Sequence, residues 1–199
     1  MSAQRKTEDK RPPVFEITGG FIREACPDDA PTLSTWWADG AVMEHAGFPD
    51  GIKTDLDALK ERLSSQKPAD ILWILEDRYH KPVGEMHHRI AGKKAVIGIK
   101  ICDRSAQGAG LGPAALKRLI THLFESFDIE KIALDTMIEN VRAQHVYASL
   151  RFKKTRIAKD VWKDQRGRLR TAVEYELDRE TFEADSDFFR NGCINRSKS

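Results

Sequence analysis

The sequence predicts an α/β (α+β mixed sheet) fold, in which one mixed sheet carries helices on both sides. Three observations support it. Apolar runs of strand length follow one another between residues 71 and 102, amphipathic helical stripes flank that block, and a glycine-rich turn at 107–112 joins its third run to a long helix. The expected order of elements is β-α-α-β-β-β-α-β-α-β-β.

The first third of the chain is expected to hold one strand and two helices. The strand lies near 20–24, where β-forming residues follow a Gly-Gly pair. Asp28 or Asp29 caps the first helix, which runs through Leu33, Trp36 and Trp37. A weak capping box predicts the start of the second helix at Thr54 with Asp57, and its buried stripe comprises Leu56, Leu59 and Leu63.

The middle of the chain reads as three strands, at 71–75, 83–90 and 95–102, of which the first two form a hairpin. Period-two alternation places Ala95, Ile97, Ile99 and Ile101 on one face of the third strand. The same alternation puts Glu85 and His87 on one face of the second strand and His88 on the other.

The last part of the fold contains two helices and three strands. A helical stripe follows the glycine-rich turn and comprises Leu116, Leu119, Ile120, Leu123 and Phe127. A strand at 132–138 comes next, and Asn140 then caps a short helix. Segments 152–162 and 169–177 close the sheet as a hairpin.

One domain is expected over residues 14–182. Residues 1–13 mix charges without an apolar core and predict a disordered tail, and residues 183–199 predict a polar tail that frays or docks weakly apart from Phe188-Phe189. A chain of 199 residues with 40% apolar content can bury about 70% of its unfolded surface in one domain.

Composition excludes several function classes. A net charge of +2, with no basic run interleaved with aromatics, argues against nucleic acid as a partner. No run of residues approaches the length of a membrane span, so no membrane partner is expected. The three cysteines are odd in number and lack metal-ligand spacing, so we expect reduced thiols, no metal and a cytoplasmic protein.

The segment Gln107-Gly108-Ala109-Gly110-Leu111-Gly112-Pro113 predicts a phosphate-binding loop. Alternate glycines allow close approach of backbone N–H groups to a ligand, and Pro113 suits the first turn of the helix whose positive end follows. A P-loop is excluded because Gly112 is not followed by Lys and Ser or Thr, and a dinucleotide fingerprint is excluded because Pro113 stands where its third glycine would be.

The remaining pattern, Gln107-x-x-Gly110-x-Gly112, resembles the acetyl-coenzyme A loop of the GCN5-related N-acetyltransferases (GNAT superfamily). A second segment, Asn140-x-x-Ala143-x-x-x-Tyr147-x-x-Leu150-x-Phe152, is similar to that family's second cofactor motif. The texture is closest to the branch of ribosomal-protein N-acetyltransferases. The resemblance implies the GNAT fold and a cofactor site formed by Ile101, Cys102, Gln107, Gly108, Ala109, Gly110, Leu111, Gly112, Asn140 and Ala143.

The reaction that this resemblance implies is direct attack of a primary amine on acetyl-CoA in a ternary complex, with Tyr147 as general acid. Many relatives carry a glutamate base on the strand before the loop, in Ala-Glu-Ile-Gly, but this chain has Val96 there. Glu85 is the expected substitute, as base or as substrate anchor, and His87 and His88 are expected to be structural or exposed. Cys102 is expected to be a buried thiol rather than a nucleophile.

The family usually has glycine at the position of Arg151. If the backbone there has a positive φ, Arg151 carries a penalty of about 1 kcal/mol.

The acceptor is expected between the region 39–50, with Glu44 and His45, and the last hairpin, with Trp162 and Asp164. The amine itself, a small molecule or a protein, is left open, and so is a homodimer. The alternative function is a non-catalytic acyl-CoA-binding or regulatory protein with the same fold, which the valine at position 96 favours.

Overall fold

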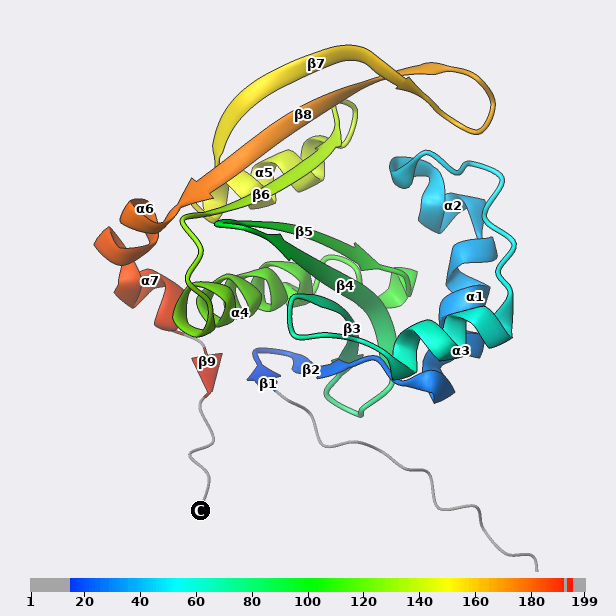
Figure 1. Cartoon of the computed structure of the whole chain (residues 1–199), viewed down its shortest axis with the longest axis horizontal. Coiled ribbons are helices and arrows are strands. Elements are labelled where there is room, and N and C mark those ends of the chain that lie inside the picture. The colour runs from blue at the N-terminus through cyan, green and yellow to red at the C-terminus, as the bar shows by residue number, and fades with distance from the viewer. Residues whose placement is uncertain (1–14, 192, 195–199) are drawn as a thin grey trace, which may run out of the picture.

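The computed structural model describes residues 15–191 and 193–194, and it contains a single mixed sheet (Figure 1). Its strands are β1 (Phe15–Ile17), β2 (Gly20–Glu24), β3 (Asp70–Asp77), β4 (Pro82–Ala91), β5 (Lys94–Ile101), β6 (Lys131–Met137), β7 (Lys153–Lys163), β8 (Leu169–Asp178) and β9 (Cys193–Ile194). Across the described residues these strands are ordered β7-β8-β6-β5-β4-β3-β2-β1-β9. Only the β5–β6 pair is parallel; every other neighbouring pair is antiparallel.

The helices cover both faces of this sheet, as predicted. They are α1 (Ala30–Ala38), α2 (Gly40–Met43), α3 (Leu56–Ser64), α4 (Leu111–Ser126), α5 (Val141–Ser149), α6 (Arg179–Ala184) and α7 (Ser186–Arg190). Strand β3 shows the two faces directly. Trp73 belongs to the core beneath α4, whereas Leu72 and Ile74 belong to a second core with Leu33 of α1 and Leu59 of α3.

The N-terminal prediction was right for the strand but missed its partner. Strand β2 has the predicted bounds, and β1 pairs with it as a hairpin through the turn at Gly19, whose φ is 90°. The predicted disordered tail at 1–13 lies outside the described residues.

Asp29 is the N-cap residue of α1, as one of the two predicted alternatives, but it does not cap the helix through its side chain. The Asp29 carboxylate makes no capping bond to α1, because it accepts hydrogen bonds from Cys26 N and from the Arg23 guanidinium. The N-cap of α3 is Asp55, whose carboxylate accepts from the N–H groups of Asp57 and Ala58, and not Thr54. Asp at the N-cap satisfies two helix donors at once, which explains the shift by one residue.

The expectation of a fraying C-terminal segment is wrong for residues 183–190. Helices α6 and α7 pack their phenylalanines into the main core, where Phe182 and Phe189 are 2% and 0% exposed. Phe188 instead lies beneath two cations, with Lys117 Nζ 4.1 Å and Arg151 Cζ 4.5 Å from its ring centre. Phe188 and Phe189 therefore anchor α7 against α4.

Arg151 has a φ of 68°, so the condition attached to its predicted penalty is met. It ends α5 in a left-handed turn, in which Phe152 N donates to Tyr147 O at 3.1 Å. Its guanidinium pairs with Asp185 at 2.7 Å on the surface.

We expect Arg151→Gly to be more stable than Arg151→Ala by about 1 kcal/mol. Both changes remove the same ion pair and ring contact, but only glycine removes the strain of the positive φ. In thermal unfolding this difference corresponds to about 2–4 °C in Tm. Equal midpoints for the two variants would show that the backbone at this position is not strained.

Candidate active site

The site lies where β5 and β6 separate. The two parallel strands pair only from Lys94 to Val96 and from Lys131 to Ala133. Beyond these residues they diverge, and a cavity of about 620 Å³ opens between them. It is lined by the ends of both strands, by the glycine-rich loop, by the start of α4 and by α5. The gap therefore offers unpaired strand edges and a helix N-terminus to one ligand.

The glycine-rich loop forms one end of this cavity. Gly108 and Gly110 have φ values of 87° and 82°, which a side chain would strain. Helix α4 begins at Leu111, so the end of the predicted loop already belongs to its first turn, and Pro113 lies in that turn as predicted. The first-turn N–H groups have no intrahelical acceptors, so this end of the cavity suits an anion.

All but one of the predicted cofactor-binding residues line the cavity; the exception is Ala109. Two backbone groups at the end of β5 already have partners within the chain. The N–H of Cys102 donates to Val83 O at 2.9 Å, so β4 already engages it. The carbonyl of Ile101 accepts from Gln107 Nε2 at 3.0 Å, and this bond holds the loop against the end of β5.

Asn140 lines the cavity and caps α5 as predicted, since its Oδ1 accepts from Ala143 N at 3.1 Å. Two arginines, Arg104 and Arg142, line the cavity. Lys117 does not, because it is stacked on Phe188. Any anion at this end thus meets two arginines in addition to the helix N-terminus.

Tyr147 lines the cavity from the α5 side of the sheet. It is 6% exposed and packs edge-on against Tyr175 with ring centres 5.5 Å apart. Burial, with a smaller contribution from the charge of Asp135, raises the pKa of its phenol to about 12. The hydroxyl therefore stays protonated across the range in which enzymes work.

Glu85 also lines the cavity, but both of its oxygens are engaged. Lys100 Nζ pairs with Oε1, and Trp37 Nε1 donates to Oε2 at 2.8 Å. The residue is 3% exposed. A carboxylate held in this way is a structural link between β4, β5 and α1, and it has little freedom to take a proton from a substrate.

The two neighbouring histidines lie on opposite faces, as predicted. His87 faces the cavity over Gly98, where a Cβ would lie only 2.3 Å from its Cε1. Burial and then the charge of Lys100 lower the pKa of His87. His88 is fully buried, accepting from Trp73 Nε1 at 3.0 Å and contacting Pro68 O at 2.8 Å, so it is structural.

Cys102 is buried, and burial raises the pKa of its thiol to about 12. A thiol with such a pKa is not ionised near neutrality and is a poor nucleophile. This agrees with the interpretation of Cys102 as a small buried side chain.

Asp135 is the functional candidate that sequence reasoning missed. It lies on β6 opposite Glu174 of β8, and it lines the cavity. Within the described part of the chain, no hydrogen bond or ion pair engages its carboxylate. Desolvation by the cavity walls, followed by the charge of Glu174, raises the pKa of Asp135. The only signal in the sequence was an aspartate that follows the apolar run Ile132 to Leu134 in this strand.

Asp135 and Tyr147 reach the cavity from opposite faces of the sheet. Leu134 pairs with Tyr175, against which Tyr147 packs, so Tyr147 lies on the Leu134 side. Asp135, the next residue on the strand, points to the other side. Both line one cavity because the strands have separated at this level.

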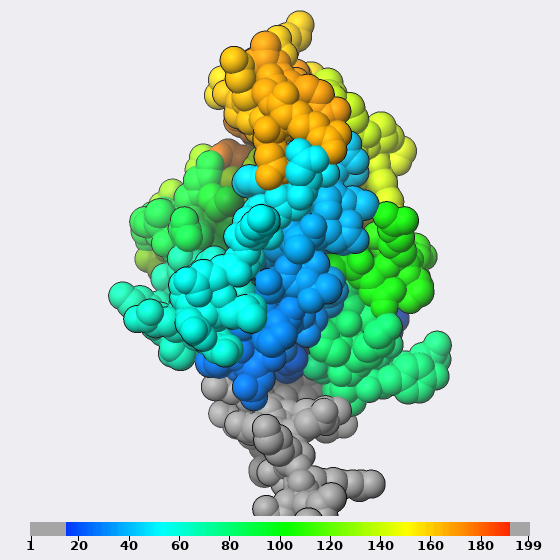
Figure 2. Space-filling model, turned by 90° about the vertical axis from the view of Figure 1, so that its right-hand side faces the viewer, coloured from blue at the N-terminus to red at the C-terminus, as the bar shows by residue number. Residues whose placement is uncertain are grey.

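A second cavity of about 500 Å³ adjoins the first, and the two share His45, Ala46 and Asp135. It lies between the loop after α2 and the β7–β8 turn, which meet on the face shown in Figure 2. His45, Trp162 and Asp164 line it as expected for the acceptor region, but Glu44 lines neither cavity.

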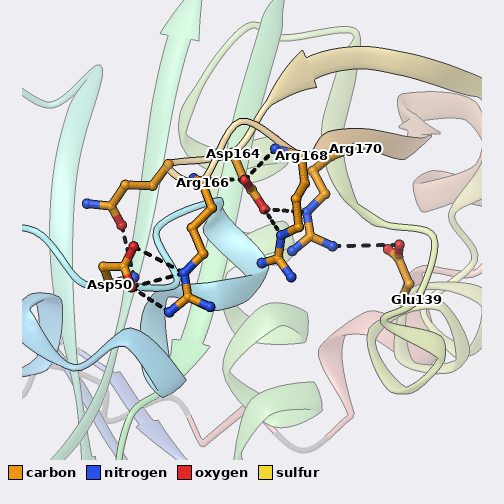
Figure 3. Close-up of polar contacts among 7 residues, drawn as sticks. Asp50, Glu139, Asp164, Arg166, Arg168 and Arg170 are labelled. Atoms are coloured by element: carbon orange, nitrogen blue, oxygen red, sulfur yellow. Dashed lines mark hydrogen bonds and ion pairs between the residues drawn. The ribbon is translucent and has the colours of Figure 1, made fainter.

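The β7–β8 turn is fastened over this second cavity by a network of polar contacts (Figure 3). Arg166 pairs with Asp50, and Gln165 Nε2 donates to Gly51 O at 2.9 Å. Asp164 has no exposed side-chain surface and accepts from the guanidinium Nε atoms of Arg168 and Arg170 at 2.8 and 2.9 Å. The turn thus has a fixed position, and the charge of Asp164 is neutralised.

Two kinds of feature are absent from residues 15–191 and 193–194. No group of three or more His, Cys, Asp or Glu residues is placed to hold a metal ion. No helix is long and apolar enough to cross a membrane.

The chain matches the family model described as an acetyltransferase (GNAT) domain over residues 21–153, more than half of its length. Solved structures share the fold at low identity. A spermidine N-acetyltransferase from Vibrio cholerae, in complex with CoA and spermine, is 17% identical with a TM-score of 0.74, covering 83% of this chain and 99% of that one. A GNAT-family acetyltransferase from Bacillus anthracis is 14% identical with a TM-score of 0.70, covering 83% and 98%. One from Streptococcus pneumoniae is 19% identical with a TM-score of 0.68, covering 79% and 98%.

Proposed function

Because the chain belongs to the GNAT acetyltransferase family, we propose that it transfers the acetyl group of acetyl-CoA to a primary amine in a ternary complex. The observation that carries this proposal is the cavity between β5 and β6. It combines an anion-binding loop at one end with a protonated phenol and an unpaired carboxylate on its two sides. Acetyl-CoA would supply an activated thioester, and residues of the chain would bind it and assist the proton transfers.

The glycine-rich loop fits a pyrophosphate. Positive φ angles at two glycines, the first turn of α4, and the neighbouring Arg104 and Arg142 provide backbone N–H groups and positive charge for it. The unpaired edge of β5 beyond Val96 fits an amide-bearing arm that hydrogen-bonds like a strand. These residues would hold the thioester at the level of Asp135 and Tyr147.

We propose Asp135, rather than Glu85, as the proton acceptor. An alkyl amine has a pKa near 10.4 and arrives as an ammonium ion. Asp135 can pair with that ion and take one proton from it, because its carboxylate is unpaired among the described residues. The neutral amine that results then attacks the thioester carbonyl, and its nitrogen loses a second proton to solvent as the amide forms. Glu85 remains a link to Lys100 and Trp37 and would position Lys100 at the cavity wall.

Tyr147 is proposed as the general acid at the departing sulfur. Formation of the C–N bond breaks the C–S bond, and the sulfur leaves with the electron pair. The phenol of Tyr147 donates a hydrogen bond or its proton to that sulfur, and solvent restores the proton. A free thiol has a pKa near 8.5, so the leaving group needs only moderate assistance.

The second candidate is a non-catalytic acyl-CoA-binding protein, which the absence of a glutamate at position 96 favoured. Val96 does line the cavity and is 42% exposed, so no carboxylate reaches the cavity from that position. Asp135 supplies a carboxylate from the neighbouring strand instead, which supports the enzyme over the binding protein. The resemblance to the ribosomal-protein branch, and a cytoplasmic homodimer, stay predictions.

The test is release of CoA thiol from acetyl-CoA over a panel of primary amines, together with calorimetric binding of acetyl-CoA to the full chain. We expect turnover that needs both the protein and an amine. Cofactor binding without turnover on any amine would favour the binding protein. Stronger thermal stabilisation by NAD or ATP than by acetyl-CoA would overturn the assignment of the loop.

A further inference from the structure

The second cavity points to the class of amine, an inference that rests on the proposed function. We propose that the acceptor is a monoamine that carries one positive charge and a flat apolar group, and not a polyamine. Three features of the described residues support this: the pairing of the carboxylates, the aromatic residues that line the second cavity, and a lysine that lines it.

Three carboxylates line the two cavities: Glu85, Asp135 and Asp164. Glu85 is paired with Lys100, and Asp164 is paired with Arg168 and Arg170. Only Asp135 has no such partner in the part of the chain that the structure describes. The two cavities therefore hold one uncompensated negative charge, at the point where they meet, and this suits one ammonium group.

Carboxylates close to the cavities are compensated as well. Glu174, beside Asp135 on β8, lies 3.6 Å from Arg156, and Glu139 lies 3.8 Å from Arg170. Asp50 is held by Arg166. Glu44, beside His45, is an exception, but it lines neither cavity. Apart from Asp135, a polyamine would thus find no unpaired carboxylate among the described residues that line the two cavities.

Two aromatic residues, Phe48 and Trp162, line the second cavity. Phe48 is 39% exposed, and the ring of Trp162 lies directly on the backbone of Gly47, where a Cβ would be 2.3 Å from the ring. This glycine lets the indole lie against the loop, and Gln165 N, bonded to Gly47 O at 3.0 Å, keeps the two segments together. Two aromatic rings beside a single carboxylate suit an apolar group attached to an ammonium.

Lys163 is the last residue of β7, next to Trp162 in the sequence, and it also lines the second cavity. An ammonium on the lysine side chain repels the distal cations of a polyamine but not a neutral aromatic group. Like-charge opposition of this kind is a means of rejecting a competing substrate.

The test compares kcat/KM for phenethylamine, n-butylamine and spermidine at saturating acetyl-CoA. We expect kcat/KM for phenethylamine to exceed that for each of the other two amines by about tenfold or more, because its ring fills the apolar part of the cavity. Trp162→Ala should lower the value for phenethylamine by about tenfold and that for n-butylamine much less. Lys163→Glu, with Lys163→Gln as the matched control, should raise kcat/KM for spermidine relative to that for phenethylamine. This variant leaves Trp162 in place, so its effect does not depend on how the indole packs.

The outcomes separate the two proposals. A higher kcat/KM for spermidine than for phenethylamine in the wild type would overturn the monoamine assignment while leaving the acetyltransferase intact. Equal losses for both monoamines in Trp162→Ala, with no gain for spermidine in Lys163→Glu, would overturn it too. No turnover of any of the three amines, despite bound acetyl-CoA, would count against the proposed function and this inference together.

Discussion

Asp135→Asn is expected to lower kcat/KM for the amine at neutral pH by about 10²–10⁴, the range typical of a lost general base. Asparagine keeps the size and the position of the side chain on β6 but cannot take a proton. The rate should be measured as thiol release under conditions in which acetyl-CoA is saturating. Glu85→Gln gives the competing assignment its own test.

The pH profile makes this prediction specific. In the wild type, kcat/KM should fall on the acid side as Asp135 becomes protonated, at a pH above the ordinary carboxylate range because the pKa of Asp135 is raised. In Asp135→Asn the amine must arrive neutral, so the rate should climb about tenfold per pH unit toward the amine pKa near 10.4. If Glu85→Gln shows that slope and Asp135→Asn does not, Glu85 is the base.

Glu174→Gln is the matched control, since Glu174 lines neither cavity and its charge raises the pKa of Asp135. We expect its acid limb to move to lower pH while the plateau stays near the wild-type value. Replacing the Asp135 carboxylate by an amide should not lower the free energy of unfolding. A carboxyl whose pKa is raised in the folded state destabilises the fold above that pKa, so Asp135→Asn should unfold at the same temperature or higher at pH 7.

Tyr147→Phe is expected to lower kcat by about 10²-fold, near the lower end of the range for general acids, with little change in KM for the amine. The phenyl ring keeps the packing against Tyr175 and removes only the donor. Tyr175→Phe is the matched control, because that tyrosine is equally buried but does not line the cavity. Equal effects of the two changes would mean that packing, and not proton donation, explains the loss.

Much of the fold could be predicted because the apolar residues of the sequence recur with the periods of strands and helices. Strands β3 to β5, helix α4 and the cap at Asn140 depend on alternation, a helical stripe and one local hydrogen bond, all of which are local properties. The C-terminal helices could not be predicted in this way. Whether Phe182 and Phe189 are buried depends on α4 and on each other, at 5.1 Å between ring centres, and not on their polar neighbours in the sequence.

The candidate site also has a part that local sequence predicts and a part that only the fold brings together. The phosphate-binding end is one continuous segment of chain, so its residues and its spacing were visible together. The other end joins β6, the loop after α2 and the β7–β8 turn, which lie far apart in the sequence. Asp135 becomes a candidate only because β5 and β6 separate beside it, and Glu85 loses priority only because Lys100 and Trp37 engage its oxygens.

Acetyl transfer to an amine is tested most directly by identifying the products of a complete reaction. Equimolar acetyl-CoA and phenethylamine, incubated with the full chain, should give free CoA and N-acetylated amine in equal amounts by mass spectrometry and thiol titration. Tyr147→Phe and Asp135→Asn should yield the same products more slowly. Bound acetyl-CoA that stays intact, or CoA released without an acetylated amine, would contradict the claim that this cavity transfers acetyl groups to amines.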